Sequence, residues 1–164
     1  MVEIGDPAPD FEAPYASRVD ADEMTWGETY RLSDQLGDGP VVLAFFPGAF
    51  SPTCVGEMNS LNERLESFEE HAATVVGISA DLPFALHEFH DELGLGFDVL
   101  SDYNRSAAKA YDAAIDSEFT GLEDINSRAL FVIDSEETVA YKWDGDPINE
   151  PPYDEVEDAV KDAA

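Results

Sequence analysis

The feature that most constrains the fold is an apolar run over residues 41–46 that stops abruptly at Pro47 and Gly48. Its length, its β-branched residues and the Pro-Gly pair behind it predict a buried strand. A helical pattern follows, because apolar residues recur at steps of three and four: Cys54, Met58, Leu61, Leu65 and Phe68. A buried strand that leads directly into a helix indicates an α/β chain.

The start of this helix can be placed from the sequence. Ser51 is a good N-cap, and Pro52 suits the first helical position. Cys54 then lies in the first turn, where the helix dipole and the free backbone N–H groups favour an anion. A thiolate is an anion, so Cys54 is predicted to be a reactive nucleophile. The alternative is a structural cysteine, because free cysteines are often buried in a core.

Strands and helices alternate through the rest of the chain. Apolar runs predict strands at 29–32, 74–79, 98–100, 129–133 and 138–143, the last two as a hairpin. Four helices are predicted, and the first covers 52–70. The second runs from Pro83 to 92, with Asp81 as its N-cap and Gly94 as the residue that ends it. The third runs from Asp102 or Asn104 to Tyr111, and the fourth follows Pro152.

The remaining segments are less regular. Residues 1–14 suggest an extended arm with one short strand, 15–28 a polar loop, and 33–37 a single helical turn. Residues 112–127 fit no regular pattern. A chain of 164 residues is expected to form one domain over 1–164.

This order of elements predicts an α/β fold with a central mixed sheet and helices on both faces. Ligand chemistry is then expected at the carboxyl ends of the parallel strands, where the loop from Pro47 to Cys54 lies. If strand 129–133 runs antiparallel to strand 41–46, Arg128 begins at the same edge, close to Cys54. A fixed guanidinium there would stabilise a thiolate and the charge that develops on a reacting oxygen. The alternative for Arg128 is a solvated strand end.

Several stretches resemble one family. Pro47, Ser51 and Cys54 match the Pro-x-x-x-Thr/Ser-x-x-Cys motif of peroxiredoxins, the thiol peroxidases, and the wider stretch is most similar to the alkyl hydroperoxide reductase E subgroup, which includes one-cysteine enzymes. Segments 5–11, 100–102 and 127–134 also resemble the family, in family order. The resemblance implies a thioredoxin-like fold and covers nearly the whole chain.

The resemblance also implies roles for the motif residues. Cys54 would attack the O–O bond of a peroxide, forming a sulfenic acid and releasing water or an alcohol. The hydroxyl of Ser51 would hydrogen-bond the peroxide and the sulfur, in addition to capping the helix. Pro47 would shield the thiolate from bulk water. For Ser51 and Pro47 the alternatives are a helix cap and a turn former with no further role.

Three further residues flank the motif. Glu57, one turn after Cys54, matches a glutamate of the family and would orient Arg128 or another arginine; the alternative is a solvated helix acid. Phe46 and Phe50 are expected to form an apolar wall that admits organic hydroperoxides.

The charge of the chain is unusual, because 37 acidic and 8 basic residues give a net charge of −29. The acidic residues are spread through the segments predicted to fold. We expect adaptation to molar salt, where the Debye length falls to about 3 Å; the alternative is an acidic protein of an ordinary cytosol. Nucleic acids and anionic membranes are unfavourable partners for such a surface. No signal-peptide pattern and no apolar run of ~20 residues is present, so a cytoplasmic location is expected.

Cys54 is the single cysteine of the sequence, which leaves no internal resolving thiol. A sulfenic acid would therefore need an external reductant: a small thiol, a thioredoxin or glutaredoxin, or another partner protein. The resemblance implies a homodimer or a higher homo-oligomer. Two other functions stay open, a peroxide sensor that relays oxidation to a partner and a non-catalytic interaction module.

No metal or other cofactor is expected from the sequence. His87 and His90 are spaced at i and i+3, which is not the His-Glu-x-x-His pattern of zinc proteases. A solvated helix face is the expected setting for both.

Overall fold

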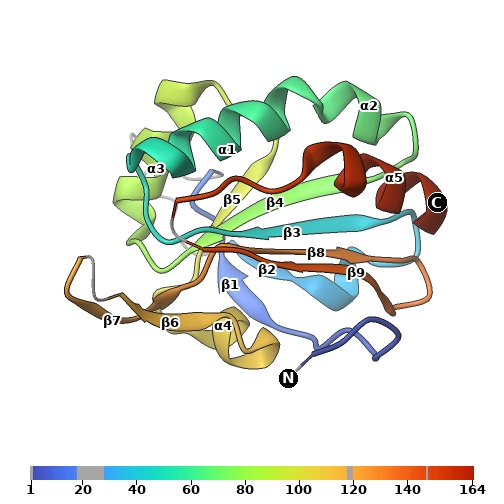
Figure 1. The fold of residues 1–164 in the computed structure, drawn as a ribbon, viewed down its shortest axis with the longest axis horizontal. Coiled ribbons are helices and arrows are strands. Elements are labelled where there is room, and N and C mark those ends of the chain that lie inside the picture. The colour runs from blue at the N-terminus through green and yellow to red at the C-terminus, as the bar shows by residue number, and fades with distance from the viewer. Residues whose placement is uncertain (1, 18–27, 118–119, 147) are drawn as a thin grey trace.

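A mixed five-stranded sheet lies at the centre of the computed structural model, which describes residues 2–17, 28–117, 120–146 and 148–164 (Figure 1). Its strands lie in the order β5 (Asp98–Ser101), β4 (Thr74–Ser79), β3 (Val41–Phe45), β8 (Ala129–Ile133) and β9 (Val139–Asp144). Strands β3, β4 and β5 are parallel, whereas β8 runs antiparallel to both β3 and β9. The predicted mixed sheet is confirmed, and each strand ends within one residue of its predicted range.

Helices cover both faces of the sheet, as predicted (Figure 1). One face carries α1 (Pro52–Glu63), α2 (Leu65–Glu69), α3 (Pro83–Leu93) and α5 (Tyr153–Ala163). The other carries α4 (Ser106–Tyr111), the antiparallel pair β1 (Glu12–Pro14) and β2 (Thr29–Arg31), and the 3₁₀ turn η1 (Leu32–Asp34). Every residue of β3 is buried because both faces are covered, and this is why its sequence is a continuous apolar run.

The predicted helix 52–70 is in fact two helices. The chain leaves helical geometry at Arg64, with φ −96° and ψ 1°, before α2 begins. There the Arg64 guanidinium pairs with Asp154 at 2.9 Å and Glu157 at 3.1 Å, both on α5. The apolar spacing continues unchanged from Leu61 across the break, so the sequence pattern does not reveal it.

The segment 112–127, which fits no regular pattern in the sequence, contains an antiparallel pair, β6 (Ala114–Ser117) and β7 (Leu122–Asn126). Strand β7 is largely polar and exposed, whereas β6 is partly buried, and the register of the pair shifts between Ile115 and Ser117. Figure 1 shows this pair projecting from the central sheet beside α4.

The helix boundaries confirm some predicted caps and correct others. Gly94 ends α3 with a left-handed φ of 62°, as predicted. Asp102 accepts hydrogen bonds from two first-turn amides of α4 at 2.9 Å each, although Arg105 occupies the N-cap position. Asp81 is not the cap of α3, because Leu82 occupies that position and no side chain caps it.

The outer segments agree in part with the sequence. The arm over 1–14 contains the short strand β1, and the helical turn expected at 33–37 begins one residue earlier as η1. Most of the loop predicted at 15–28 lies outside the described residues. Among the described residues, no helix combines the length and the apolar character needed to cross a membrane.

Candidate active site

Cys54 lies in the first turn of α1, at the carboxyl edge of β3, and is fully buried. Ser51 is the N-cap residue and Pro52 begins the helix, as the sequence predicts. The thiol belongs to the core cluster between the sheet and the helices α1, α2, α3 and α5. A cysteine at this position is close to the amide groups of a helix N-terminus, which favour an anion.

Arg128 directly precedes β8 and lies against Cys54. The antiparallel register pairs Phe45 with Ala129, so the start of β8 meets the end of β3. The contacts of the guanidinium include three with described residues: Nη2 lies 3.3 Å from Cys54 Sγ, Nη1 donates to Glu57 at 2.6 Å, and Nε donates to the Asp146 carbonyl oxygen at 3.1 Å. Arg128 is almost fully buried, so the solvated strand end considered as its alternative is wrong.

Glu57 is fully buried, so the alternative interpretation as a solvated helix acid is also wrong. Its Oε2 accepts the hydrogen bond from Arg128, whereas its Oε1 has no hydrogen-bond partner among the described residues. Burial raises the pKa of Glu57 to about 7; Arg128 opposes this shift and Glu150 adds to it. A single guanidinium thus faces two acidic groups, the Cys54 thiol and the Glu57 carboxyl.

The hydroxyl of Ser51 does not cap the helix, which corrects the role predicted for this side chain. It donates to the Gly48 carbonyl oxygen at 3.1 Å, and the N-cap has no side-chain hydrogen bond. Pro52 at the first helical position has no N–H to offer, and the hydroxyl turns toward the preceding loop. Because the hydroxyl donates its hydrogen to Gly48, its oxygen lone pairs stay available to accept a hydrogen bond from an incoming ligand.

A cavity of about 280 Å³ adjoins this group. Its lining includes two of the motif residues, Pro47 and Ser51, together with Arg128. The rest of the lining is mainly apolar or carries hydroxyl groups: Pro52, Thr53, Ser117, Thr120, Ile125 and Ile148. The cavity therefore brings a ligand to the guanidinium and to the loop that precedes Cys54.

Sequence reasoning missed the outer wall of this cavity. Ile125 lies on β7, in a segment to which the sequence assigns no structure, and Ile148 lies between β9 and α5. Neither residue stands in an apolar pattern of the sequence, since Ile125 lies between polar neighbours and Ile148 is an isolated isoleucine. In the structure Ile148 is 73% exposed. The sequence carries no signal that would have found them.

The aromatic wall predicted from Phe46 and Phe50 is not part of the lining. Phe46 faces the same side of the sheet as Val42 and Ala44 of β3 and is fully buried. The centroid of its ring lies 5.8 Å from that of Phe89. Phe50 is 49% exposed and meets the same ring edge-on at 5.2 Å. Both rings thus pack on α3, and this corrects their predicted place in the substrate pocket.

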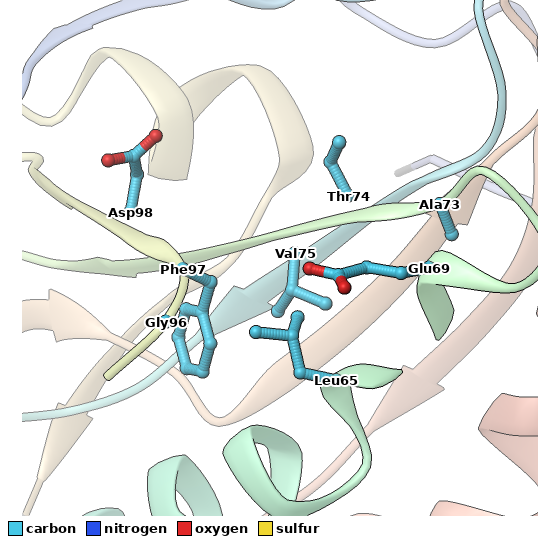
Figure 2. A pocket seen from close by; sticks show the side chains of 8 residues that line it. All are labelled: Leu65, Glu69, Ala73, Thr74, Val75, Gly96, Phe97 and Asp98. Carbon is cyan, nitrogen blue, oxygen red and sulfur yellow. The ribbon is translucent and has the colours of Figure 1, made fainter. Parts of the chain in front are cut away.

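A second cavity, of about 180 Å³, lies at the amino-terminal ends of β4 and β5 against α2, away from the carboxyl ends of the parallel strands (Figure 2). Figure 2 shows Leu65, Val75 and Phe97 beside the carboxylate of Glu69. Its lining contains no cysteine, histidine, lysine or arginine, so it does not compete with the cavity beside Cys54.

The two histidines of α3 bond to the backbone. His87 Nδ1 lies 3.3 Å from the Ala16 oxygen and His90 Nε2 lies 3.1 Å from the Phe97 oxygen. Both side chains are mostly buried, so the solvated face predicted for them is wrong. Within the described ranges, no group of three or more side chains could hold a metal ion.

The chain is similar to known proteins over most of its length. The family model of the AhpC/TSA family matches residues 4–142. Peroxiredoxin Bcp of Bacillus subtilis is 32% identical over 147 residues, which cover 87% of this chain and 85% of that protein. A putative peroxiredoxin of Mycobacterium tuberculosis is 34% identical over 134 residues, covering 80% of this chain and 78% of the relative.

Solved structures lead to the same group of proteins. The crystal structure of peroxidoxin BcpB from Mycobacterium tuberculosis superposes with a TM-score of 0.84 and 27% identity, over 100% of this chain and 99% of the other. The similarity to the alkyl hydroperoxide reductase E subgroup is not tested by these comparisons and stays a prediction.

Proposed function

Since the chain belongs to the AhpC/TSA family of peroxiredoxins, we propose that it is a one-cysteine, thiol-dependent peroxidase in which Cys54 reduces the peroxide. The family relatives support the peroxidase activity itself. The observation that supports the role of Cys54 is its contact with Arg128, whose Nη2 lies 3.3 Å from the sulfur. A guanidinium fixed at this distance can stabilise negative charge at the sulfur and at the reacting oxygens during the reaction.

In the proposed reaction the Cys54 thiolate attacks one oxygen of the peroxide. An S–O bond forms, the O–O bond breaks, and the leaving oxygen takes up a proton to become water or an alcohol. The sulfur is oxidised to a sulfenic acid while the peroxide is reduced by two electrons. Arg128 stabilises the negative charge as it moves from sulfur to oxygen, because its guanidinium is already fixed by Glu57 and by the Asp146 carbonyl group.

Ser51 and Pro47 complete the proposed site from the preceding loop. Both line the cavity beside Arg128. The Ser51 hydroxyl, which now donates to Gly48, can accept a hydrogen bond from the peroxide or rotate to donate to its oxygen. Pro47 has no N–H and presents an apolar ring, which limits the access of water to the reacting atoms.

The substrates proposed are hydrogen peroxide and organic hydroperoxides. A cavity of about 280 Å³ accommodates more than hydrogen peroxide alone. Its apolar side chains, among them Ile125 and Ile148, offer contacts to an organic group while Arg128 faces the peroxide end.

Regeneration is proposed to use a thiol from outside the chain, since Cys54 is the only cysteine. The external thiol would displace the sulfenic oxygen as water and form a mixed disulfide, and a second thiol would then release Cys54. A small thiol or a thioredoxin- or glutaredoxin-type protein meets this requirement. Because Cys54 is fully buried, a protein reductant can reach it only after the structure around the thiol opens.

A second candidate function follows from the same lone thiol. Oxidised Cys54 could transfer its oxidation to a cysteine of a partner protein, which would make the chain a peroxide sensor or redox relay. Fast oxidation combined with slow turnover by every small thiol and by thioredoxin and glutaredoxin would favour this function over that of a peroxidase.

Rapid mixing of the reduced protein with hydrogen peroxide or an organic hydroperoxide, in molar salt, tests the proposal. Trp143 packs against the core cluster that contains Cys54, so its fluorescence is a suitable reporter. We expect oxidation many orders of magnitude faster than that of free cysteine, abolished by Cys54→Ser and slowed by Arg128→Ala. The matched control is Arg31→Ala, because Arg31 pairs with Glu12 on the surface. Oxidation no faster than that of free cysteine would contradict the proposal and favour an interaction module.

A further inference from the structure

Asp81 joins the carboxyl edge of the sheet to the loop that precedes Cys54. It follows β4 by two residues, and its Oδ2 accepts a hydrogen bond from the Ala49 backbone N–H at 2.8 Å. Ala49 lies midway between Pro47 and Ser51, the two loop residues that line the cavity.

The Asp81 carboxylate is itself held in place. The hydroxyl of Ser79 donates to the same Oδ2 at 2.7 Å and accepts a bond from the Asp81 N–H at 3.2 Å. The hydroxyl of Ser101, at the end of β5, donates to the Asp81 carbonyl oxygen at 2.6 Å. Ser79 and Ser101 are buried, so Asp81 is hydrogen-bonded to the buried ends of two neighbouring strands, β4 and β5.

The loop, by contrast, has few attachments of its own. Within the described part of the chain, the Ala49–Asp81 bond is the only hydrogen bond that ties residues 47–50 to another segment, since the Ser51 hydroxyl bonds Gly48 inside the loop. Phe50 has a φ of 67°, a left-handed conformation that a residue with a Cβ adopts only when its surroundings impose it. The packing of the Phe50 ring against Phe89 of α3 also holds this loop in place.

We propose that Asp81 is a positioning residue for the peroxide step, which holds the 47–51 loop so that Ser51 and Pro47 face the substrate beside Arg128. The proposal rests on the proposed peroxidase function of Cys54. The contact between Cys54 and Arg128 is formed by α1 and the start of β8, and the loop takes no part in it. Loss of the Asp81 contact therefore disturbs the reaction with peroxide more than the reactivity of the sulfur itself.

The test compares four variants with the wild type in molar salt. Asp81→Ala removes the acceptor, whereas Asp81→Asn retains a side-chain oxygen that can accept the Ala49 N–H. Asp81→Asn is therefore the matched control, whereas Ser101→Ala removes the hydrogen bond that holds the Asp81 backbone and leaves the carboxylate itself in place. Ser79→Ala removes the group that orients the carboxylate and gives a second test should Asp81→Ala fail to fold.

Three quantities are measured: the rate constant for oxidation of Cys54 by hydrogen peroxide, the rate constant for its alkylation by iodoacetamide, and the hydrogen–deuterium exchange of the peptide that contains Ala49. For Asp81→Ala we expect oxidation to slow by about 10- to 100-fold, the cost of a small misplacement of groups around a reacting centre. Alkylation should be unchanged or faster, and exchange at the loop should rise. Ser79→Ala and Ser101→Ala should change all three in the same directions by less, and Asp81→Asn should stay near the wild type.

Several outcomes would overturn the proposal. Unchanged exchange at Ala49 in Asp81→Ala would show that the carboxylate does not hold the loop. Oxidation and alkylation that fall by the same factor would indicate a general structural role instead of positioning. A failure of the proposed function is distinguishable, because the wild type would then react with peroxide no faster than free cysteine, whatever the exchange of the loop.

Discussion

Cys54 and Glu57 lie one helical turn apart and contact the same guanidinium, Sγ at 3.3 Å from Nη2 of Arg128 and Oε2 at 2.6 Å from Nη1. When both acids are ionised, one positive charge serves two negative charges in a fully buried group. Burial raises the pKa of Glu57 although Arg128 opposes the shift. A protonated Glu57 makes a weaker demand on the guanidinium that also contacts the sulfur.

The first prediction concerns stability against pH. The native pKa of Glu57 is about 7, above the ordinary 4.5, so the native state retains a proton that the unfolded chain has lost between these values. The free energy of unfolding should therefore fall as pH rises from about 4.5 to 7, by about 3 kcal/mol from this group, and level off above. Glu57→Gln should lack this component.

Denaturant unfolding of the wild type and Glu57→Gln at pH 5 and pH 8, in molar salt, measures this contribution. The difference between the two proteins isolates Glu57 from the three histidines and the other acids. A difference in stability that is the same at both pH values would contradict the raised pKa.

The second prediction concerns Arg128→Lys. A lysine keeps the charge but cannot donate to Glu57, Cys54 and the Asp146 carbonyl group together in one fixed plane. We expect the rate constant for peroxide reduction to fall by about 10²- to 10³-fold, as when a preorganised donor is removed from a reacting centre. Arg31→Lys, on the surface, should leave the rate unchanged. A rate close to wild type in Arg128→Lys would mean that charge alone is sufficient.

The sequence predicts the sheet well because the strands β3, β4 and β8 are covered on both faces and read as continuous apolar runs. The meeting of Cys54 and Arg128 follows from topology, since an antiparallel neighbour must begin at the edge where β3 ends. The hydrophobic pattern records which strands are buried, and the contact follows once β8 is taken to run antiparallel to β3.

Side-chain hydrogen bonds and the cavity wall are less predictable. Ser51 and Asp81 are both residue types that favour the N-cap position. In the structure the Ser51 hydroxyl donates to Gly48 and the Asp81 carboxylate accepts from Ala49. Several donors and acceptors lie close to each side chain, and the sequence pattern does not distinguish among them. Strand β7 is mostly polar and exposed, so nothing in its periodicity indicates that Ile125 reaches the cavity.

The third prediction concerns the selectivity for peroxides. Ile148 lines the cavity and is 73% exposed, so its replacement has little effect on the core. Ile148→Ser should lower the rate with an apolar organic hydroperoxide by about 10-fold relative to the rate with hydrogen peroxide, since apolar contacts of a few methylene groups are worth this much. Stopped-flow measurements with both peroxides give the ratio. The matched control is Ile4→Ser, an exposed isoleucine that does not line the cavity. An unchanged ratio would show that Ile148 does not contact the organic group.

The fourth prediction concerns salt. A net charge of −29 on 164 residues makes the compact state repel itself, and this repulsion is screened as the Debye length falls from about 10 Å at 0.1 M salt to about 3 Å at 1 M. We expect the melting temperature to rise steadily with KCl from 0.1 M to 2 M. Sucrose is the control, because it favours compact states without screening charge and should not replace the salt. A melting temperature indifferent to KCl would contradict the adaptation to molar salt predicted from the composition.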